Sequence, residues 1–310
     1  MVLLYPLSSL SQQLAQKTSA GYPNVSPSSV DARNAPLTRL GSFAPIRQST
    51  MKAVCTLLVL SLLTVVSAQE KPARGEVRTL PESTAGKTIS LNPDYWLYGA
   101  DEPGTDQWPL LIVLHGGGGT GRDIQKIKGA AMGPLRTMKE AGIDAIVVAP
   151  QAAENPIKLG AKGGWVPSDL DLLLEHLLAT LPIDPDRVYL TGVSMGGYGT
   201  YAWAGVSPQH FAAVAPMVGG IGPGGPKDIT PQLDLWGKNL ATLPLRAYYG
   251  AKDKVVPMDR GEMILAAIKK AGGTQAELIV YDDLGHDAAR RPYSDPDFFK
   301  WLFSHTRSNP

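Results

Sequence analysis

Short, unbroken runs of aliphatic residues constrain the fold of this chain more than any other feature of its sequence. Residues 110–114 and 145–149 are two such runs, and neither contains a polar side chain. A strand that is apolar on both faces must be covered on both faces, which is typical of a parallel sheet. Stretches with helical spacing separate the runs, so we expect an α/β fold with a mostly parallel sheet and helices on both faces.

The same alternation continues along the chain without an internal repeat, which favours one α/β domain over residues 86–306. Parallel strands need crossover connections, and these are usually helical. We expect further strands at 95–98, 187–191, 211–218, 245–249 and 277–281, and helices at 129–141, 169–181, 195–205, 259–271 and 296–304.

Residues 51–68 have the form of a secretory signal peptide. Lys52 precedes an apolar run, and small residues lead to a predicted cleavage site between Ala68 and Gln69. A membrane-spanning helix is the alternative, but the run is shorter than the roughly 20 residues that a bilayer requires. We therefore predict a secreted or periplasmic protein that has no stable membrane span once the signal is removed.

The segments on either side of the signal peptide are expected to lie outside the α/β domain. Residues 1–50 are rich in serine, proline and glutamine, with four basic residues and one acid, and an arginine- and serine-rich, acid-poor leader can be an organelle transit peptide. A complete signal peptide behind a transit peptide would be redundant, so we interpret 1–50 as a non-native or disordered leader, with translation starting at Met51. Residues 69–85 are polar and contain two prolines, and we predict that they form a linker.

Charge and cysteine content exclude several classes of function. The chain has 29 basic and 28 acidic residues, so no broad basic surface is available for binding nucleic acid. The single cysteine, Cys55, lies in the predicted signal peptide. The mature chain would therefore contain neither a disulfide framework nor a cysteine-ligated metal site, and we predict no metal.

Three residues that can act together in catalysis each follow a different predicted strand. They are Ser194, Asp253 and His286, and the carboxyl ends of parallel strands meet at one edge of a sheet. Ser194 lies between Gly192 and Gly196, a spacing typical of the sharp strand-to-helix turn that exposes a nucleophilic serine. We predict that His286 is the general base for Ser194 and that Asp253 orients the imidazole.

Other residues could take these roles, but their positions are less suitable. Asp282 and Asp283 precede His286 in the same loop, whereas the orienting carboxylate usually comes from a separate loop. The remaining histidines are assigned to loop structure, helix packing or the surface; they are His115, His176, His210 and His305.

A glycine-rich loop follows the strand at 110–114 and is expected to stabilise negative charge. We predict an oxyanion hole made by the backbone N–H groups of Met195 and Gly117, with Gly118 as a second candidate. The loop also has the glycine spacing of a dinucleotide site. That reading requires an acidic residue at the end of the next strand, and the sequence there ends in Pro150, so no cofactor is predicted.

The chain resembles the α/β-hydrolases, and within them the secreted carboxylesterases of the phospholipase/carboxylesterase, polysaccharide-esterase and poly(hydroxyalkanoate)-depolymerase types. The segments HGGGG, GVSMGG, AKDKVVP and LGHD carry this resemblance, which extends over roughly residues 90–305. Residues 187–219 also resemble a bacterial group of predicted peptidases. The resemblance implies a triad of Ser194, Asp253 and His286 and no cofactor.

These observations predict a secreted serine hydrolase that cleaves carboxylic esters through an acyl-enzyme. Its substrate would be a small-molecule or polysaccharide ester, and Trp165 is a candidate for lining the substrate pocket. A serine peptidase of the same fold is the alternative within enzymes. A catalytically silent binding protein with a hydrolase fold is the alternative from another class. The sequence leaves the oligomeric state open.

Overall fold

The computed structural model describes residues 75–99, 107–153, 164–222, 225 and 228–307. The chain divides into Met1–Ala68 and Gln69–Pro310, and every described residue belongs to the second unit. The predicted leader and signal peptide lie outside the described residues. The division coincides with the predicted cleavage site, but cleavage itself stays a prediction.

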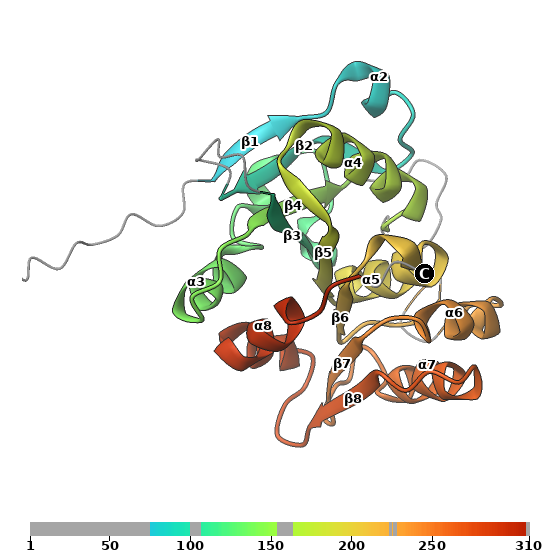
Figure 1. Ribbon diagram of the computed structural model, residues 1–310. Coiled ribbons are helices and arrows are strands. Elements are labelled where there is room, and N and C mark those ends of the chain that lie inside the picture. Colours follow the sequence, from blue (N-terminus) through green and yellow to red (C-terminus); the bar gives the residue numbers. More distant parts are fainter. Residues whose placement is uncertain (1–74, 100–106, 154–163, 223–224, 226–227, 308–310) are drawn as a thin grey trace, which may run out of the picture. The chain divides into compact units, whose positions relative to one another are not determined.

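One eight-stranded sheet organises the described residues (Figure 1). The strand order is β1-β2-β4-β3-β5-β6-β7-β8. β1 and β2 run antiparallel to their neighbours, while all other pairs are parallel, which confirms the predicted α/β fold. The strands are β1 (Glu76–Thr79), β2 (Leu91–Tyr98), β3 (Trp108–Leu114), β4 (Ile146–Ala152), β5 (Ile183–Val193), β6 (Ala213–Met217), β7 (Leu245–Gly250) and β8 (Ala276–Tyr281).

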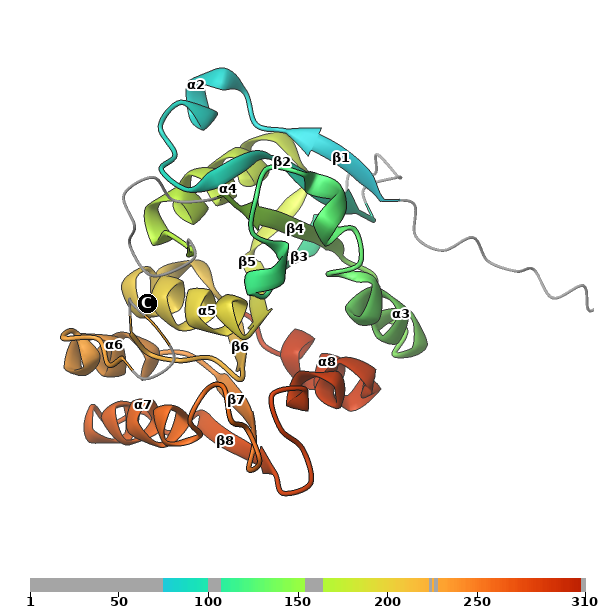
Figure 2. The same cartoon turned by 180° about the vertical axis from the view of Figure 1, so that it is seen from behind.

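Helices cover both faces of this sheet, with α3 and α8 on one side and α4 to α7 on the other (Figure 2). The central strand β3 supplies side chains to both layers. Leu110 and Ile112 belong to one buried cluster, and Leu111 and Val113 belong to the other. This alternation explains why the run is apolar throughout. The helices are α2 (Glu82–Ala85), α3 (Met132–Glu140), α4 (Pro167–Thr180), α5 (Met195–Val206), α6 (Leu233–Leu240), α7 (Asp259–Lys270) and α8 (Pro296–Phe303).

The predicted linker at 69–85 is wrong in its second half. It contains β1, which pairs with β2 at the edge of the sheet, and the short helix α2. All four residues of β1 are exposed, so the strand has no apolar alternation that a sequence pattern could reveal. Backbone hydrogen bonds to β2 define this strand, and the α/β domain therefore begins before residue 86.

Strand β4 also extends further than its sequence predicts. It was expected to stop at Pro150, yet it continues to Ala152. The paired register of β3 and β4 ends at Ile112 and Val148, so Pro150 lies beyond it, paired only with Tyr95 of β2, and its missing N–H breaks no bond of that ladder. None of the helices in the described residues has the length and apolar content needed to cross a membrane.

Candidate active site

The candidate nucleophile lies at the turn between β5 and α5. Ser194 has φ 56° and ψ −114°, a backbone conformation that is rare for residues with a side chain. A Cβ atom on Gly192 would collide with the backbone of Gly196, and one on Gly196 would collide with the carbonyl of Leu114. Both flanking positions therefore require glycine, as the sequence predicts for this turn.

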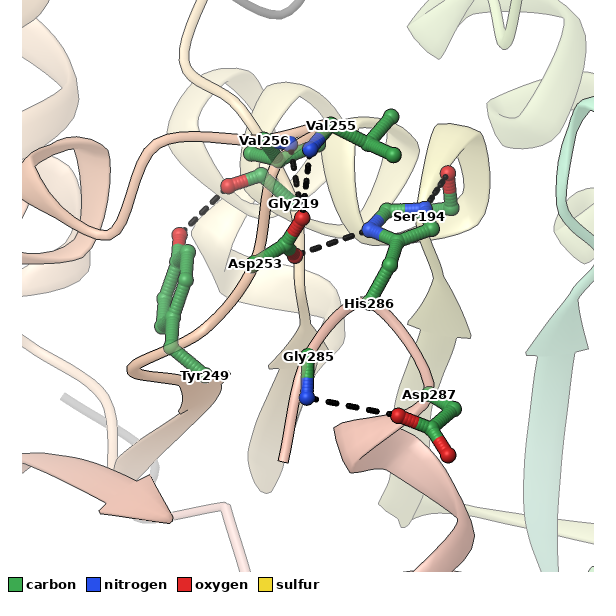
Figure 3. A network of polar contacts seen from close by, with 9 residues as sticks. All are labelled: Ser194, Gly219, Tyr249, Asp253, Val255, Val256, Gly285, His286 and Asp287. Carbon is green, nitrogen blue, oxygen red and sulfur yellow. Dashed lines mark hydrogen bonds and ion pairs between the residues drawn. The ribbon is translucent and has the colours of Figure 1, made fainter. Parts of the chain in front are cut away.

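Ser194, His286 and Asp253 form one continuous chain of polar contacts (Figure 3). Nε2 of His286 lies 2.8 Å from Oγ of Ser194, and Nδ1 lies 2.8 Å from Oδ2 of Asp253. The Asp253 side chain is fully buried, whereas 30% of the His286 side chain is exposed. The structure thus brings together the three predicted residues, with the imidazole between the hydroxyl and the carboxylate.

Backbone contacts hold the loops that carry the acid and the base. Oδ1 of Asp253 accepts hydrogen bonds from the N–H groups of Val255 (2.7 Å) and Val256 (3.0 Å), as Figure 3 shows. The N–H of Lys252 donates to the carbonyl of Leu284 at 2.9 Å, which ties the loop after β7 to the loop after β8. The second oxygen of Asp253 is consequently left to face the imidazole.

Hydrogen bonds from a buried tyrosine and from Ser194 itself hold the segment at the end of β6, which lies against the nucleophile turn. The hydroxyl of Tyr249 donates to the carbonyl of Gly219 and lies 3.3 Å from the hydroxyl of Tyr201. Burial raises the pKa of Tyr249 well above its ordinary value, so the hydroxyl keeps its proton and remains a donor. The N–H of Ser194 in turn donates to the carbonyl of Met217 at 2.9 Å. The end of β6 and the segment after it therefore support the turn.

The glycine-rich loop after β3 lies beside the start of α5. Oγ1 of Thr120 is 3.6 Å from Sδ of Met195, and a Cβ on Gly116 would lie 3.7 Å from Cβ of Ser194. Gly117 and Gly118 are exposed, and a Cβ on either would meet no atom within 4 Å. Open space therefore adjoins the predicted oxyanion donors, whose role stays a prediction.

His115 holds this loop. Within the described part of the chain, it forms no hydrogen bond with His286. Its Nδ1 lies 2.7 Å from the carbonyl of Gly116, and its Nε2 accepts from the N–H of Ala152 at 3.0 Å. Burial lowers the pKa of His115, so the ring is neutral with its proton on Nδ1. As the sequence suggests, His115 shapes the glycine loop.

Trp165 is buried against the same loop. Its indole N–H donates to the carbonyl of His115 at 3.3 Å, and the two rings lie 4.8 Å apart. A Cβ on Gly199 would collide with Trp165, so the indole also packs closely on α5. The indole thus has a packing role, and a part in substrate binding stays a prediction.

Two of the alternative candidates, Asp283 and His210, pair with residues outside the Ser194 site. Asp283 forms an ion pair with Arg291 at 2.7 Å, and the hydrogen bond from that guanidinium lowers the pKa of Asp283. His210 lies 3.1 Å from Asp171 on α4. Within the described ranges, no group of three or more histidine, cysteine or acidic residues could hold a metal ion.

Comparisons with known proteins agree with this fold. Residues 149–296 match the model of the Dienelactone hydrolase family. The chain has the α/β-hydrolase fold. A solved structure of a thermostable esterase shares the fold with a TM-score of 0.60 at 21% identity, over 76% of this chain and 64% of the other.

Two curated relatives of this chain carry esterase names. The probable feruloyl esterase C of Aspergillus niger is 29% identical over 76% of this chain and 82% of its own length. A protein of Nocardia uniformis subsp. tsuyamanensis named as an esterase, NocK, is 27% identical over 49% of this chain. The chain spans only 42% of the length of NocK, so the activity of the whole protein is a matter for proposal.

Two polar residues beside the glycine loop were not predicted from the sequence. Gln151 and Asn92 are both buried, and their side chains hydrogen-bond to each other and to the loop. Glutamine and asparagine carry no motif, and Gln151 directly follows the proline that was expected to end its strand. A buried polar residue is recognisable only once the fold is known.

Proposed function

We propose that this α/β-hydrolase is a serine esterase that cleaves carboxylic esters through an acyl-enzyme on Ser194. The observation that carries the proposal is the continuous contact from Ser194 through His286 to Asp253, with 2.8 Å at each step. Only an imidazole between a hydroxyl and a buried carboxylate can take the proton of the serine and remain stabilised as an imidazolium.

The proposed reaction has two steps. His286 Nε2 takes the proton of Ser194 as its Oγ attacks the ester carbonyl, and the resulting imidazolium then gives that proton to the departing alcohol. In the second step, His286 takes a proton from the water that attacks the acyl-enzyme. The imidazolium then gives that proton to Oγ of Ser194 as the acyl–Oγ bond breaks, which releases the carboxylic acid and free Ser194. Asp253 keeps the ring in one tautomer, with the Nδ1 proton directed at Oδ2.

The negative charge of each tetrahedral intermediate needs donors that are already in place. We assign this role to the N–H groups of Met195 and Gly117, with Gly118 as the second candidate for the loop donor. Two observations support the assignment: the loop lies against Met195 through Thr120, and its glycines adjoin open space.

The proposed substrate is a small-molecule or polysaccharide-linked carboxylic ester. The esterase names of the curated relatives support this class, including the feruloyl esterase that matches over 82% of its length. A peptide amide is the alternative substrate within the same mechanism. Hydrolysis of p-nitrophenyl esters from acetate to palmitate, alongside feruloyl and acetylated polysaccharides and a peptide amide, tests the choice. Faster cleavage of the amide would contradict the esterase assignment.

A fluorophosphonate probe tests the nucleophile directly. The wild-type protein should be labelled and should hydrolyse p-nitrophenyl esters, whereas Ser194→Ala should do neither. Ser207→Ala is a control, because Ser207 is a buried serine that hydrogen-bonds to an aspartate, Asp171, and not to an imidazole. Equal labelling of the wild type and Ser194→Ala would contradict the proposal.

We also propose that the protein is exported by the segment 51–68. The positively charged start, apolar run and small residues before Gln69 support this. N-terminal sequencing of protein recovered from the periplasm or the medium should begin at Gln69. A mature protein that retains residues 51–68 and stays inside the cell would contradict export.

A further inference from the structure

The oxyanion loop, which comprises residues 115–123, has no side chains at the two positions that are proposed to bind the oxyanion. The residues proposed to supply its N–H donor are Gly117 and Gly118, and they have no side chains with which to anchor themselves. A Cβ on either residue would meet nothing within 4 Å. Their positions must therefore be set by contacts that hold the flanking residues of the loop.

The end of β4 supplies those contacts. Beyond the last paired register with β3, at Val148, the strand continues alongside the oxyanion loop. The N–H of Ala152 donates to Nε2 of His115, and the carbonyl of Ala152 accepts from the N–H of Gly121; both distances are 3.0 Å. These two backbone bonds fix the start and the far side of the loop.

The side chain of Gln151 fixes the centre of the loop. Its Nε2 donates to the carbonyl of Gly119 at 2.8 Å and to the carbonyl of Asp123 at 2.9 Å. Both protons of the amide are thus used within one loop. The side chain is completely buried, so water does not compete for these bonds. Gly119 directly follows the two candidate oxyanion donors.

Asn92 fixes the orientation of the Gln151 amide. Its Nδ2 donates to Oε1 of Gln151 at 2.6 Å and to the carbonyl of Arg122 at 3.2 Å. Asn92 lies in β2 where the register with β4 shifts, between Leu91 and Tyr95. The irregular ladder brings the Asn92 amide against Gln151, and the side-chain pair links the two strands to the loop.

We infer that Gln151, held by Asn92, is a positioning residue that keeps the oxyanion loop in its reactive conformation. This inference rests on the proposed ester hydrolysis. The oxyanion hole acts only if its donors are placed before charge develops, because a preorganised donor needs no rearrangement at the moment of reaction. Gln151 touches neither substrate nor triad in this role, and it acts through the backbone of Gly119.

The test compares Gln151→Met with Thr137→Val. Methionine keeps the length of the side chain without its donors. Thr137→Val likewise removes a buried bond to a carbonyl, that of Tyr293 at 2.8 Å, outside the oxyanion loop. We expect kcat for a p-nitrophenyl ester to fall about 10- to 100-fold in Gln151→Met, with KM within about twofold, because displacement of the donors weakens transition-state binding. Thr137→Val should leave both constants unchanged.

Inhibitor binding shows whether Gln151→Met displaces the oxyanion donors or only destabilises the fold. Affinity for a trifluoromethyl ketone, whose adduct places an oxyanion in the hole, should fall in Gln151→Met by the same factor as kcat/KM. The rate of fluorophosphonate labelling should fall as well. Wild-type kcat and inhibitor affinity in folded Gln151→Met would overturn the inference, as would an equal loss in Thr137→Val.

Two further variants keep the test decisive. If Gln151→Met does not fold, Asn92→Ala leaves the Gln151 donors present but removes the group that orients them. A few-fold fall in kcat at constant KM is then expected, and wild-type kcat would overturn the inference. Ser194→Ala distinguishes the two proposals: if it remains active, the proposed function fails, whereas an inactive Ser194→Ala beside a fully active Gln151→Met refutes the positioning role alone.

Discussion

Two clusters in this protein each contain a serine, a histidine and an aspartate, but the order of contacts differs. In the Ser194 cluster, His286 lies between Ser194 and Asp253. In the second cluster, which we call the Asp171 cluster, the aspartate is central. It accepts from Ser207 at 3.2 Å and from the indole of Trp203 at 2.7 Å, and it lies 3.1 Å from Nε2 of His210.

The difference decides which cluster can perform chemistry. A serine becomes a nucleophile when a base takes its proton, and only the Ser194 cluster has an imidazole nitrogen beside the hydroxyl. Ser207 instead donates to a carboxylate that also holds the Trp203 indole. The backbones differ as well, because Ser207 has φ −123° whereas Ser194 has φ 56°. The same residue types therefore build the proposed reactive site in one place and a structural contact in the other.

The largest expected difference between the clusters concerns their histidines. His286→Ala should lower kcat by about 10⁵- to 10⁶-fold, because the serine loses its base. His210→Ala should leave kcat within about twofold of the wild type, since no proton transfer depends on it. Hydrolysis of p-nitrophenyl acetate by both variants measures the difference. A large loss in His210→Ala would break the comparison.

Substitution of the two aspartates should also have very different effects on kcat. Asp253→Asn should reduce kcat by about 10⁴-fold, because the amide favours the wrong imidazole tautomer. Asp171→Asn should leave kcat near the wild-type value but lower the free energy of unfolding by about 1–3 kcal/mol, as two hydrogen-bond donors, Trp203 and Ser207, lose their charged acceptor. Steady-state kinetics and urea denaturation of each variant provide the two measurements. Similar kinetic losses in both would show that the clusters are not distinct in function.

Glycine substitution at the two serines should change stability in opposite directions. Ser194→Gly should raise the free energy of unfolding by about 1 kcal/mol, since glycine tolerates the strained backbone at this turn. Ser207→Gly should lower it by about 0.5–1 kcal/mol, because an ordinary backbone conformation gives glycine no advantage and its flexibility favours the unfolded chain. Urea denaturation of both variants tests the signs. A destabilised Ser194→Gly would argue against strain at the nucleophile.

A third histidine, His115, should make the free energy of unfolding depend on pH. Burial lowers the pKa of His115 below its ordinary value of 6.5, so the unfolded chain takes up a proton there before the folded protein does. The free energy of unfolding should therefore fall as the pH drops through about 6.5. Burial also lowers the pKa of His305, which acts in the same direction. Urea denaturation at pH 7.5 and pH 5.5 should show this fall, and His115→Gln should reduce it. An unchanged pH dependence in His115→Gln would contradict this role of His115.

The sequence predicted most of the sheet because buried parallel strands have a distinctive composition. β3 and β4 appear as apolar runs, and the glycines around Ser194 mark a turn whose geometry depends on neighbouring backbone alone. β1 escaped prediction because its four residues are exposed and only pairing with β2 makes them a strand. Pro150 gave a false end to β4, since a proline interrupts a strand only where a partner needs its N–H.

The amino-acid sequence by itself determined the α/β fold and the identity of the three residues at the strand ends, because strand composition and tight turns depend on near neighbours. Only the tertiary structure decided which serine lies beside an imidazole, and that Gln151 and Asn92 hold the oxyanion loop. Such contacts join segments that are distant in the chain. A hydrogen bond requires its donor and acceptor to lie within a few tenths of an ångström of about 2.9 Å, and such distances are set only after the sheet and its helices have packed.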